Sequence, residues 1–238
     1  MFVSSDNPPD LTIAGISPVA ESRARGAGSR SVRVRRQASA PALPELAKCE
    51  TRPDMRPGSD LADLGLRFAT PQDAPALVSL IRSAYRGDAS RAGWTSEADL
   101  VEGERIDLDS LLRLLGAPAS RILVVEDHSN PVACCRLENR EAGVVYLGTF
   151  AVCPQRQGQG LGGWLIEQAE RASAKTFGAH TIEITVVAQQ AALLAWYERR
   201  GFVRTGQTRP FPANPRYARP LRDDLHFVVL SKAVSTQS

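Results

Sequence analysis

Hydrophobic positions are irregular over the first 60 residues and become regular from about Leu64. There, short apolar runs alternate with segments in which apolar residues recur at three- and four-residue spacing. Runs of the first kind predict strands, and segments of the second kind predict amphipathic helices. The longest unit covers residues 144–177, where a β-branched apolar run ending near Val152 leads into a glycine-rich loop and then a helix closed by Gly178. We expect the rest of the domain to be organised around this unit.

The elements around this unit follow from the same patterns and from their end signals. A strand at residues 66–69 precedes a helix whose start is marked by Thr70 as N-cap, Pro71 and Asp73, and residues 87–93 are expected to form a loop. The remaining predicted elements are a helix at 108–115, a hairpin of 121–126 and 132–138, a strand at 181–187, a helix at 191–200 and strands at 202–205 and 225–231. This order predicts one mixed α+β domain of the α/β class over residues 62–233.

Residues 1–60 differ in composition from this domain. Pro, Ser, Ala, Gly and Arg dominate, and no apolar period is long enough to build a core face, so we predict a disordered N-terminal extension. Residues 22–36 hold six arginines and no acid, which is typical of a solvated tail, a nucleic-acid arm or an organellar transit segment. Because Met55 precedes the regular pattern closely, we hypothesise that it is the physiological start.

Charge and cysteine content narrow the functional classes. A formal net charge of +3 is too small to require nucleic acid or an anionic membrane as a partner. No apolar run approaches the ~18 residues of a membrane span, and Asp6, Pro8 and Pro9 interrupt any signal-peptide pattern. The four cysteines lack C-x-x-C spacing, which favours reduced thiols in a cytoplasmic protein, and the three unclustered histidines predict no metal site.

The loop glycines predict a site for a phosphate-bearing ligand. Gly158, Gly160 and Gly162 allow backbone N–H groups to turn toward an anion, and the following helix adds its unpaired amides and positive dipole end. A P-loop is excluded, because Gly163 and Trp164 stand where Lys and Ser or Thr are required.

The glycines also match the sequence pattern of a dinucleotide-binding fingerprint, but the elements around them do not match its structure. Gly158, Gly160 and Gly163 satisfy G-x-G-x-x-G, and Glu183 follows about 20 residues later. Residues 153–157, however, separate the strand from the glycines, and Glu183 lies inside a predicted strand instead of at its end. Both departures disfavour a Rossmann site.

Two segments resemble the signatures of the GNAT acetyltransferase superfamily. Residues 157–162, QGQGLG, fit its Gln/Arg-x-x-Gly-x-Gly/Ala signature, and residues 150–154 resemble the strand end before that loop. Residues 194–202, LAWYERRGF, are similar to its second signature, and the resemblance covers about residues 64–232. It implies a GNAT-like acyl-CoA N-acyltransferase fold, with a central mixed sheet of about six to seven strands and helices on both faces, and acetyl-CoA as cosubstrate without a metal.

The resemblance also implies roles for individual residues. The strand before the loop and the next strand would splay apart to form the pantetheine slot, and Tyr197 would be the acid that protonates the departing CoA thiolate. Gln190 stands where the family often has an Asn that holds the cofactor arm. The implied cofactor-binding residues are Phe150, Ala151, Val152, Gln157, Gly158, Gln159, Gly160, Leu161, Gly162 and Gln190.

The general base and the acceptor remain open at this stage. Tyr146 stands near the family's strand glutamate and is a poor base at neutral pH, so the amine either arrives neutral or loses its proton through water to Glu138 or Glu183. The acceptor site is expected from residues 94–105 and 208–225, which carry arginines and aromatics as well as Glu97 and Glu102. These opposing charges do not select an acceptor.

The expected function is transfer of an acetyl group from acetyl-CoA to a primary amine, on a small molecule or a peptide, by direct attack in a ternary complex. The alternatives are a non-catalytic CoA-binding or regulatory domain and a nucleic-acid-associated protein that acts through its basic tail. We expect a cytoplasmic monomer or homodimer with no membrane partner, and we do not expect nucleic acid to be the main partner.

Overall fold

A mixed seven-stranded sheet forms the centre of the molecule, with strand order β1-β3-β4-β5-β6-β9-β7. The computed structural model describes residues 61–91, 93–212, 214 and 216–234. The expectations for residues 1–60, including the disordered extension, the arginine-rich arm and the start at Met55, lie outside these residues.

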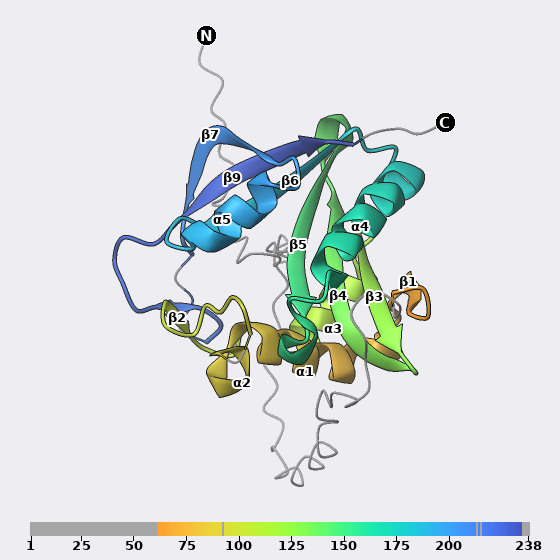
Figure 1. Cartoon of the computed structure of the whole chain (residues 1–238), viewed down its shortest axis with the longest axis horizontal. Coiled ribbons are helices and arrows are strands. Elements are labelled where there is room, and N and C mark those ends of the chain that lie inside the picture. The colour runs from red at the N-terminus through yellow and green to blue at the C-terminus, as the bar shows by residue number, and fades with distance from the viewer. Residues whose placement is uncertain (1–60, 92, 213, 215, 235–238) are drawn as a thin grey trace, which may run out of the picture.

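Figure 1 shows how the elements surround this sheet. The strands of the sheet are β1 (Gly65–Phe68), β3 (Ser120–Asp127), β4 (Asn130–Asn139), β5 (Val144–Val152), β6 (Thr181–Val187), β7 (Val203–Pro210) and β9 (His226–Ala233). The helices are α1 (Ala74–Tyr85), α2 (Gly87–Arg91), α3 (Leu108–Gly116), α4 (Leu161–Phe177) and α5 (Ala191–Glu198). A separate two-stranded sheet pairs β2 (Val101–Glu102) with β8 (Arg219–Pro220).

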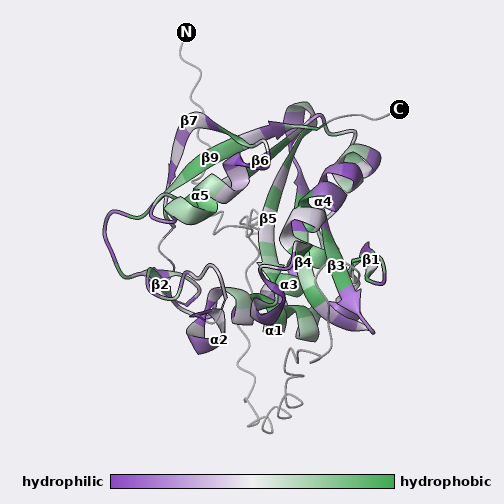
Figure 2. Cartoon of the chain, in the orientation of Figure 1, coloured by the Kyte–Doolittle hydropathy of each residue, from purple (hydrophilic) through white to green (hydrophobic). Residues whose placement is uncertain are grey.

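The sheet separates two hydrophobic cores, so helices cover both of its faces as predicted. On one face, α1 and α3 pack side chains such as Leu77 and Leu111 against Val124. On the other face, α4 and α5 pack side chains such as Leu165 against Val125. Because β3 and β4 are buried on both faces, they are apolar along most of their length (Figure 2).

The sheet opens between β5 and β6. These parallel strands are in register only from Val144–Thr181 to Tyr146–Glu183, whereas β6 stays paired with β9 over its full length. The two strands spread apart beyond this point (Figure 1), which confirms the expected splay. A register shift of β4 against β5 lies opposite Thr149, whose φ of 46° is left-handed, so β5 carries a bulge where it leaves β6.

Most predicted elements are present, but the structure differs from the expected secondary structure in three places. Residues 87–93 contain α2, the final strands are longer than predicted, and β2 with β8 was missed because neither run carries a strand pattern. Cys134 and Cys135 are free and lie in opposite cores. Cys153 is disulfide-bonded, so the expectation of reduced thiols fails at this position.

Asp107 caps α3 and ties it to the segment after β7. Its carboxylate accepts hydrogen bonds from the Ser110 backbone N–H at 2.8 Å and from the Tyr217 hydroxyl at 2.7 Å, and it pairs with Arg216 at 2.9 Å. Partial burial raises the pKa of this carboxyl, but the hydrogen bonds from Ser110 and Tyr217 prevail and lower the pKa to about 2.

We predict that Asp107→Ala lowers the free energy of unfolding by about 1 kcal/mol at pH 7. A carboxyl whose pKa is depressed on folding stabilises the protein above its ordinary pKa and loses this effect as the pH falls toward the folded value. Urea unfolding at pH 7 and pH 3 should therefore show a smaller difference from wild type at pH 3. The control is the replacement of Asp109, an exposed acid in the same turn, by Ala. An equal loss of unfolding free energy at both pH values would contradict a stabilising role of the ionised Asp107 carboxylate.

Candidate active site

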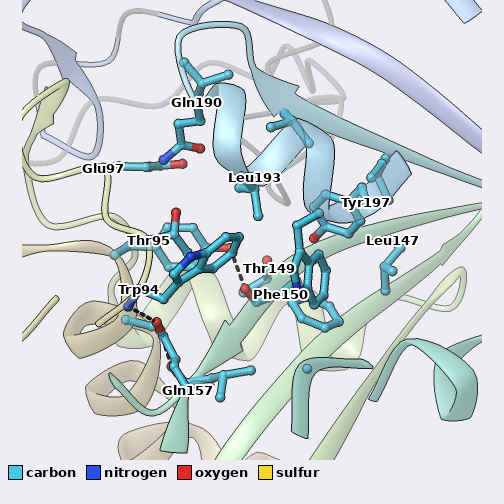
Figure 3. A pocket seen from close by; sticks show the side chains of 18 of the residues that line it. Trp94, Thr95, Glu97, Leu147, Thr149, Phe150, Gln157, Gln190, Leu193 and Tyr197 are labelled. Carbon is cyan, nitrogen blue, oxygen red and sulfur yellow. Dashed lines mark hydrogen bonds between the residues drawn. The ribbon is translucent and has the colours of Figure 1, made fainter. Parts of the chain in front are cut away.

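A cavity of about 380 Å³ occupies the opening between β5 and β6. Its walls are the glycine-rich loop, the start of α4, the inner side of α5 and residues 94–97, as the close view in Figure 3 shows. Among the described residues that line it, Glu97 and Arg200 are the ones that carry formal charge at neutral pH.

The loop before α4 presents its backbone to one end of this cavity. Gly158 and Gly160 have φ of 77° and 86°, a conformation that other residues rarely adopt. The first α4 turn closes with the Trp164 N–H donating to the Gly160 carbonyl at 3.1 Å, so the amides of residues 161–163 have no acceptor within the helix. These amides and the positive helix end form a cradle for an anion.

Arg200 places a cation beside this cradle. Its guanidinium lies 3.7 Å over the Trp196 ring and donates to the Trp196 carbonyl at 3.0 Å. A Cβ added to Gly163 would lie 3.3 Å from the Arg200 Nε, and one added to Gly162 would lie 3.2 Å from the Trp196 ring. The two glycines therefore let α5 approach the first turn of α4 closely.

The open edge of β5 turns alternate peptide groups into the cavity. The Cys153 N–H donates to the Val132 carbonyl on β4 at 2.9 Å, so the Val152 carbonyl of the same peptide points away from β4. The Val152 carbonyl accepts a hydrogen bond from Gln157 Nε2 at 3.2 Å, and the Phe150 carbonyl accepts one from the Tyr85 hydroxyl at 2.9 Å. Burial raises the pKa of Tyr85 to about 12, so Tyr85 remains a donor.

Tyr197 reaches from α5 into the cavity (Figure 3). Its ring contacts Trp196, Phe202 and Phe150 with centroid distances of 4.9, 5.4 and 6.4 Å. Burial raises the pKa of the Tyr197 phenol well above its ordinary value. The hydroxyl is therefore protonated at neutral pH and has a proton to donate.

Residues 93–97 close the cavity wall between the glycine loop and α5. The Trp94 N–H donates to Gln157 Oε1 at 2.7 Å, and Gln190 Nε2 donates to the Ser96 carbonyl at 3.2 Å. Glu97 pairs with Arg86 at 2.8 Å. The side chains of Gln157 and Gln190, which the resemblance assigned to the cofactor, thus hold this wall from both ends (Figure 3).

The two carboxylates considered as the base lie away from the cavity lining. Glu138 pairs with Arg136, and Glu183 accepts from Arg140 at 3.0 Å and from Arg209 at 2.7 Å. Glu97 is the carboxylate that the structure brings to the lining.

Most of the residues expected at the site line the cavity. They are Phe150, Val152, Gln157, Gly158, Gly160, Gly162, Gln190 and Tyr197. The Leu161 and Ala151 side chains lie in the two cores instead, and the Gln159 side chain hydrogen-bonds to Gln155 and Arg156 within the loop. These three residues can therefore contact a ligand in the cavity only through their backbone atoms.

Sequence reasoning missed Tyr85, Thr149 and Arg200 as lining residues. The only available signal for Tyr85 was its place at the end of the apolar face of α1, which favoured a core role. Arg200 follows Trp196 by four residues, the spacing of neighbours on one helix face, and this relation could have identified it.

The described residues contain no group of three or more His, Cys, Asp or Glu side chains arranged to hold a metal ion. They also contain no helix with the length and apolarity needed to cross a membrane.

Comparisons with known proteins agree with this geometry. Residues 78–202 match the model of the acetyltransferase (GNAT) family. Similar solved structures include a spermidine N-acetyltransferase from Vibrio cholerae in complex with CoA and spermine (22% identity, TM-score 0.53, 73% of this chain and 96% of that chain). The ribosomal-protein-S18-alanine N-acetyltransferase from Escherichia coli is also similar (17% identity, TM-score 0.54, 74% and 96%). At these identities the structures show a shared fold, and no curated protein sequence matches the chain significantly.

We predict that Gln157→Leu loosens residues 93–97, because it removes the acceptor of the Trp94 N–H. Loss of one hydrogen bond of about 1 kcal/mol corresponds to about fivefold faster amide exchange through local opening. Hydrogen–deuterium exchange at Trp94 measures this change. The control is Gln159→Leu, because the Gln159 side chain hydrogen-bonds within its own loop. Unchanged exchange at Trp94 in Gln157→Leu would show that Gln157 does not hold residues 93–97 in place.

Proposed function

Because the chain belongs to the acetyltransferase (GNAT) family, we propose that it transfers an acetyl group from acetyl-CoA to a primary amine by direct attack in a ternary complex. The observation that carries this proposal is the continuous cavity that joins the glycine cradle, the open edge of β5 and the Tyr197 phenol. A non-catalytic CoA-binding domain would need the first two features but not the third.

Successive parts of the cavity match the diphosphate, the pantetheine arm and the thioester of acetyl-CoA. Backbone amides around residues 158–163 and the Arg200 guanidinium would hold the diphosphate without a metal. The outward-facing peptides of Phe150 and Val152 would pair with the amides of the pantetheine arm. An N–H at the β5 bulge would then lie near the thioester and stabilise the oxyanion that forms there.

The reaction requires the thioester carbon to gain a C–N bond and lose its C–S bond. A neutral amine attacks the carbon, the carbonyl oxygen takes the negative charge, and collapse expels the CoA thiolate. Tyr197 donates its phenolic proton to the sulfur, and the amine proton leaves to solvent or to Glu97, which lines the cavity. The phenol recovers a proton from solvent before the next turnover.

Acetyl-CoA should bind to the isolated protein with measurable heat in calorimetry. We expect Gly162→Val to weaken this binding about tenfold, or about 1.4 kcal/mol, because the new side chain would enter the narrow space beside Trp196. Gly116→Val is the matched control, since nothing lies within 4 Å of a Cβ at Gly116. No binding by the folded wild type at millimolar acetyl-CoA would refute the proposed function.

Replacement of Tyr197 by Phe should lower kcat about 100-fold, because the leaving thiolate loses its acid. The Kd for acetyl-CoA should stay nearly constant, since the ring keeps its contacts with Trp196 and Phe202. Thiol release under saturating acetyl-CoA measures the effect, with Tyr217→Phe, a tyrosine that bonds to Asp107 outside the cavity, as the control. Unchanged kcat would assign Tyr197 to packing alone.

A further inference from the structure

We propose that Trp94 contacts the cofactor, and that its indole ring packs over the pantetheine arm of acetyl-CoA at the mouth of the cavity. This inference rests on the proposed acetyl transfer. It adds to the cofactor site a residue that lies outside both the glycine-rich loop and α5, in a segment that the sequence associated only with the acceptor.

Trp94 lies at the boundary between the cavity and the solvent. Its side chain lines the cavity and points into it between Gln157 and Leu193 in the view of Figure 3, yet the residue is 50% exposed. Among the described lining residues, it is the one large hydrophobic side chain that is exposed. Because apolar surface gains free energy when it is removed from water, this ring offers a face that a bound molecule can cover.

The backbone of Trp94 is attached to the glycine-rich loop. Its N–H donates to Gln157 Oε1 at 2.7 Å, and Gln157 Nε2 donates to the Val152 carbonyl on the open edge of β5 at 3.2 Å. Trp94 is therefore fixed beside the route that leads from the loop to this edge. Since the bond to Gln157 uses the backbone of Trp94, the ring can turn about its side-chain bonds without breaking it.

Trp196 forms the opposite side of this route. Its ring centroid lies 6.2 Å from that of Trp94 and 6.3 Å from that of Phe150 on β5. A Cβ added to Gly162, at the start of α4, would lie 3.2 Å from the Trp196 ring. Trp196 thus stands between the anion cradle and the β5 edge, the places proposed for the diphosphate and for the pantetheine amides. The arm that joins these groups passes between the two tryptophans.

The two indoles lie too close together to admit the arm without a movement. Carbon atoms in van der Waals contact are about 3.5–4.0 Å apart, so a chain that touches both rings requires a separation of about 7–8 Å. The centroids are 6.2 Å apart. Trp196 is held by the Arg200 guanidinium at 3.7 Å and by the edge of the Tyr197 ring at 4.9 Å. The half-exposed ring of Trp94 is therefore the one that moves outward and then covers the arm.

The arm and these side chains match in chemistry. Pantetheine carries a dimethyl branch next to the diphosphate and methylene groups between its amides. The side chains of Trp94, Trp196, Phe150 and Leu193, which line the cavity along this route, offer apolar surface to these groups. Once Trp94 covers the arm, it also limits the access of water to the thioester beyond it.

Binding of acetyl-CoA and of its nucleotide fragment to the full-length protein tests this contact by calorimetry. We expect Trp94→Ala to raise the Kd for acetyl-CoA about tenfold and Trp94→Phe to raise it less than threefold, because phenylalanine keeps an aromatic face. Adenosine 3′-phosphate 5′-diphosphate, which has the diphosphate end of the cofactor but no arm, should bind equally to all three proteins.

The control variant is Leu221→Ala, which removes an exposed apolar side chain outside the cavity lining and should keep the wild-type Kd. An unchanged Kd for acetyl-CoA in Trp94→Ala would overturn the inference. An equal loss of affinity for acetyl-CoA and for the nucleotide fragment would also overturn it, because Trp94 would then contact the nucleotide end and not the arm.

Quenching of tryptophan fluorescence by acrylamide follows the covering of the ring. The chain has three tryptophans, Trp94, Trp164 and Trp196. Saturating acetyl-CoA should lower the quenching constant of the wild type about twofold and that of Trp94→Phe much less. Trp164→Phe, whose residue lies outside the cavity lining, is the matched control and should keep the full decrease. An equal decrease in the wild type and Trp94→Phe, or no decrease in the wild type with acetyl-CoA bound, would contradict the covering role.

The outcomes separate this inference from the proposed function. Failure of the folded wild-type protein to bind acetyl-CoA would remove both. Binding that Trp94→Ala leaves unchanged would remove the contact with Trp94 and leave the cofactor assignment standing.

Discussion

The early separation of β5 from β6 is the constraint on which the site depends. After three residue pairs the two strands part, and the peptide groups on the free edge of β5 lose their sheet partners. Buried peptide groups require hydrogen bonds, and here side chains provide them, with the Tyr85 hydroxyl on Phe150 and the Gln157 amide on Val152. The edge is thereby kept from closing and left available to a ligand that carries amides of its own.

Two features keep the gap open. The bulge at Thr149 bends β5 away from β6 with a left-handed backbone that a threonine adopts only when its surroundings enforce it. On the opposite side, Trp196 and Tyr197 from α5 pack against Phe150 and line the opening in which the strands would otherwise pair. The backbone strain is confined to Thr149, and the packing of Trp196 and Tyr197 against the adjacent Phe150 offsets its energetic cost.

The sequence was informative where the site is built from local backbone. The glycine spacing predicts the loop at residues 158–162, and the resemblance of residues 194–202 to the second family signature implies a role for Tyr197, because both patterns depend on neighbours in the chain. Residues 94–105 were expected at the acceptor site, but the contacts that fix the wall at residues 93–97 could not be predicted. Its position depends on hydrogen bonds from Trp94 to Gln157 and from Gln190 to Ser96, and nothing in either segment identifies the other. The same holds for ion pairs, since 29 basic and 26 acidic residues allow many pairings.

Gln157 connects the two halves of the cavity more directly than any other described contact. It belongs to the glycine loop, yet its side chain bonds to both the β5 edge and the Trp94 backbone. Gly93 lies so close that an added Cβ would come within 2.6 Å of Gln157 Oε1, so the contact tolerates little displacement. A change in the glycine-rich loop must therefore alter the position of the wall at residues 93–97. Gln157 acts through this geometry, by setting the distance between the glycine-rich loop and residues 94–97.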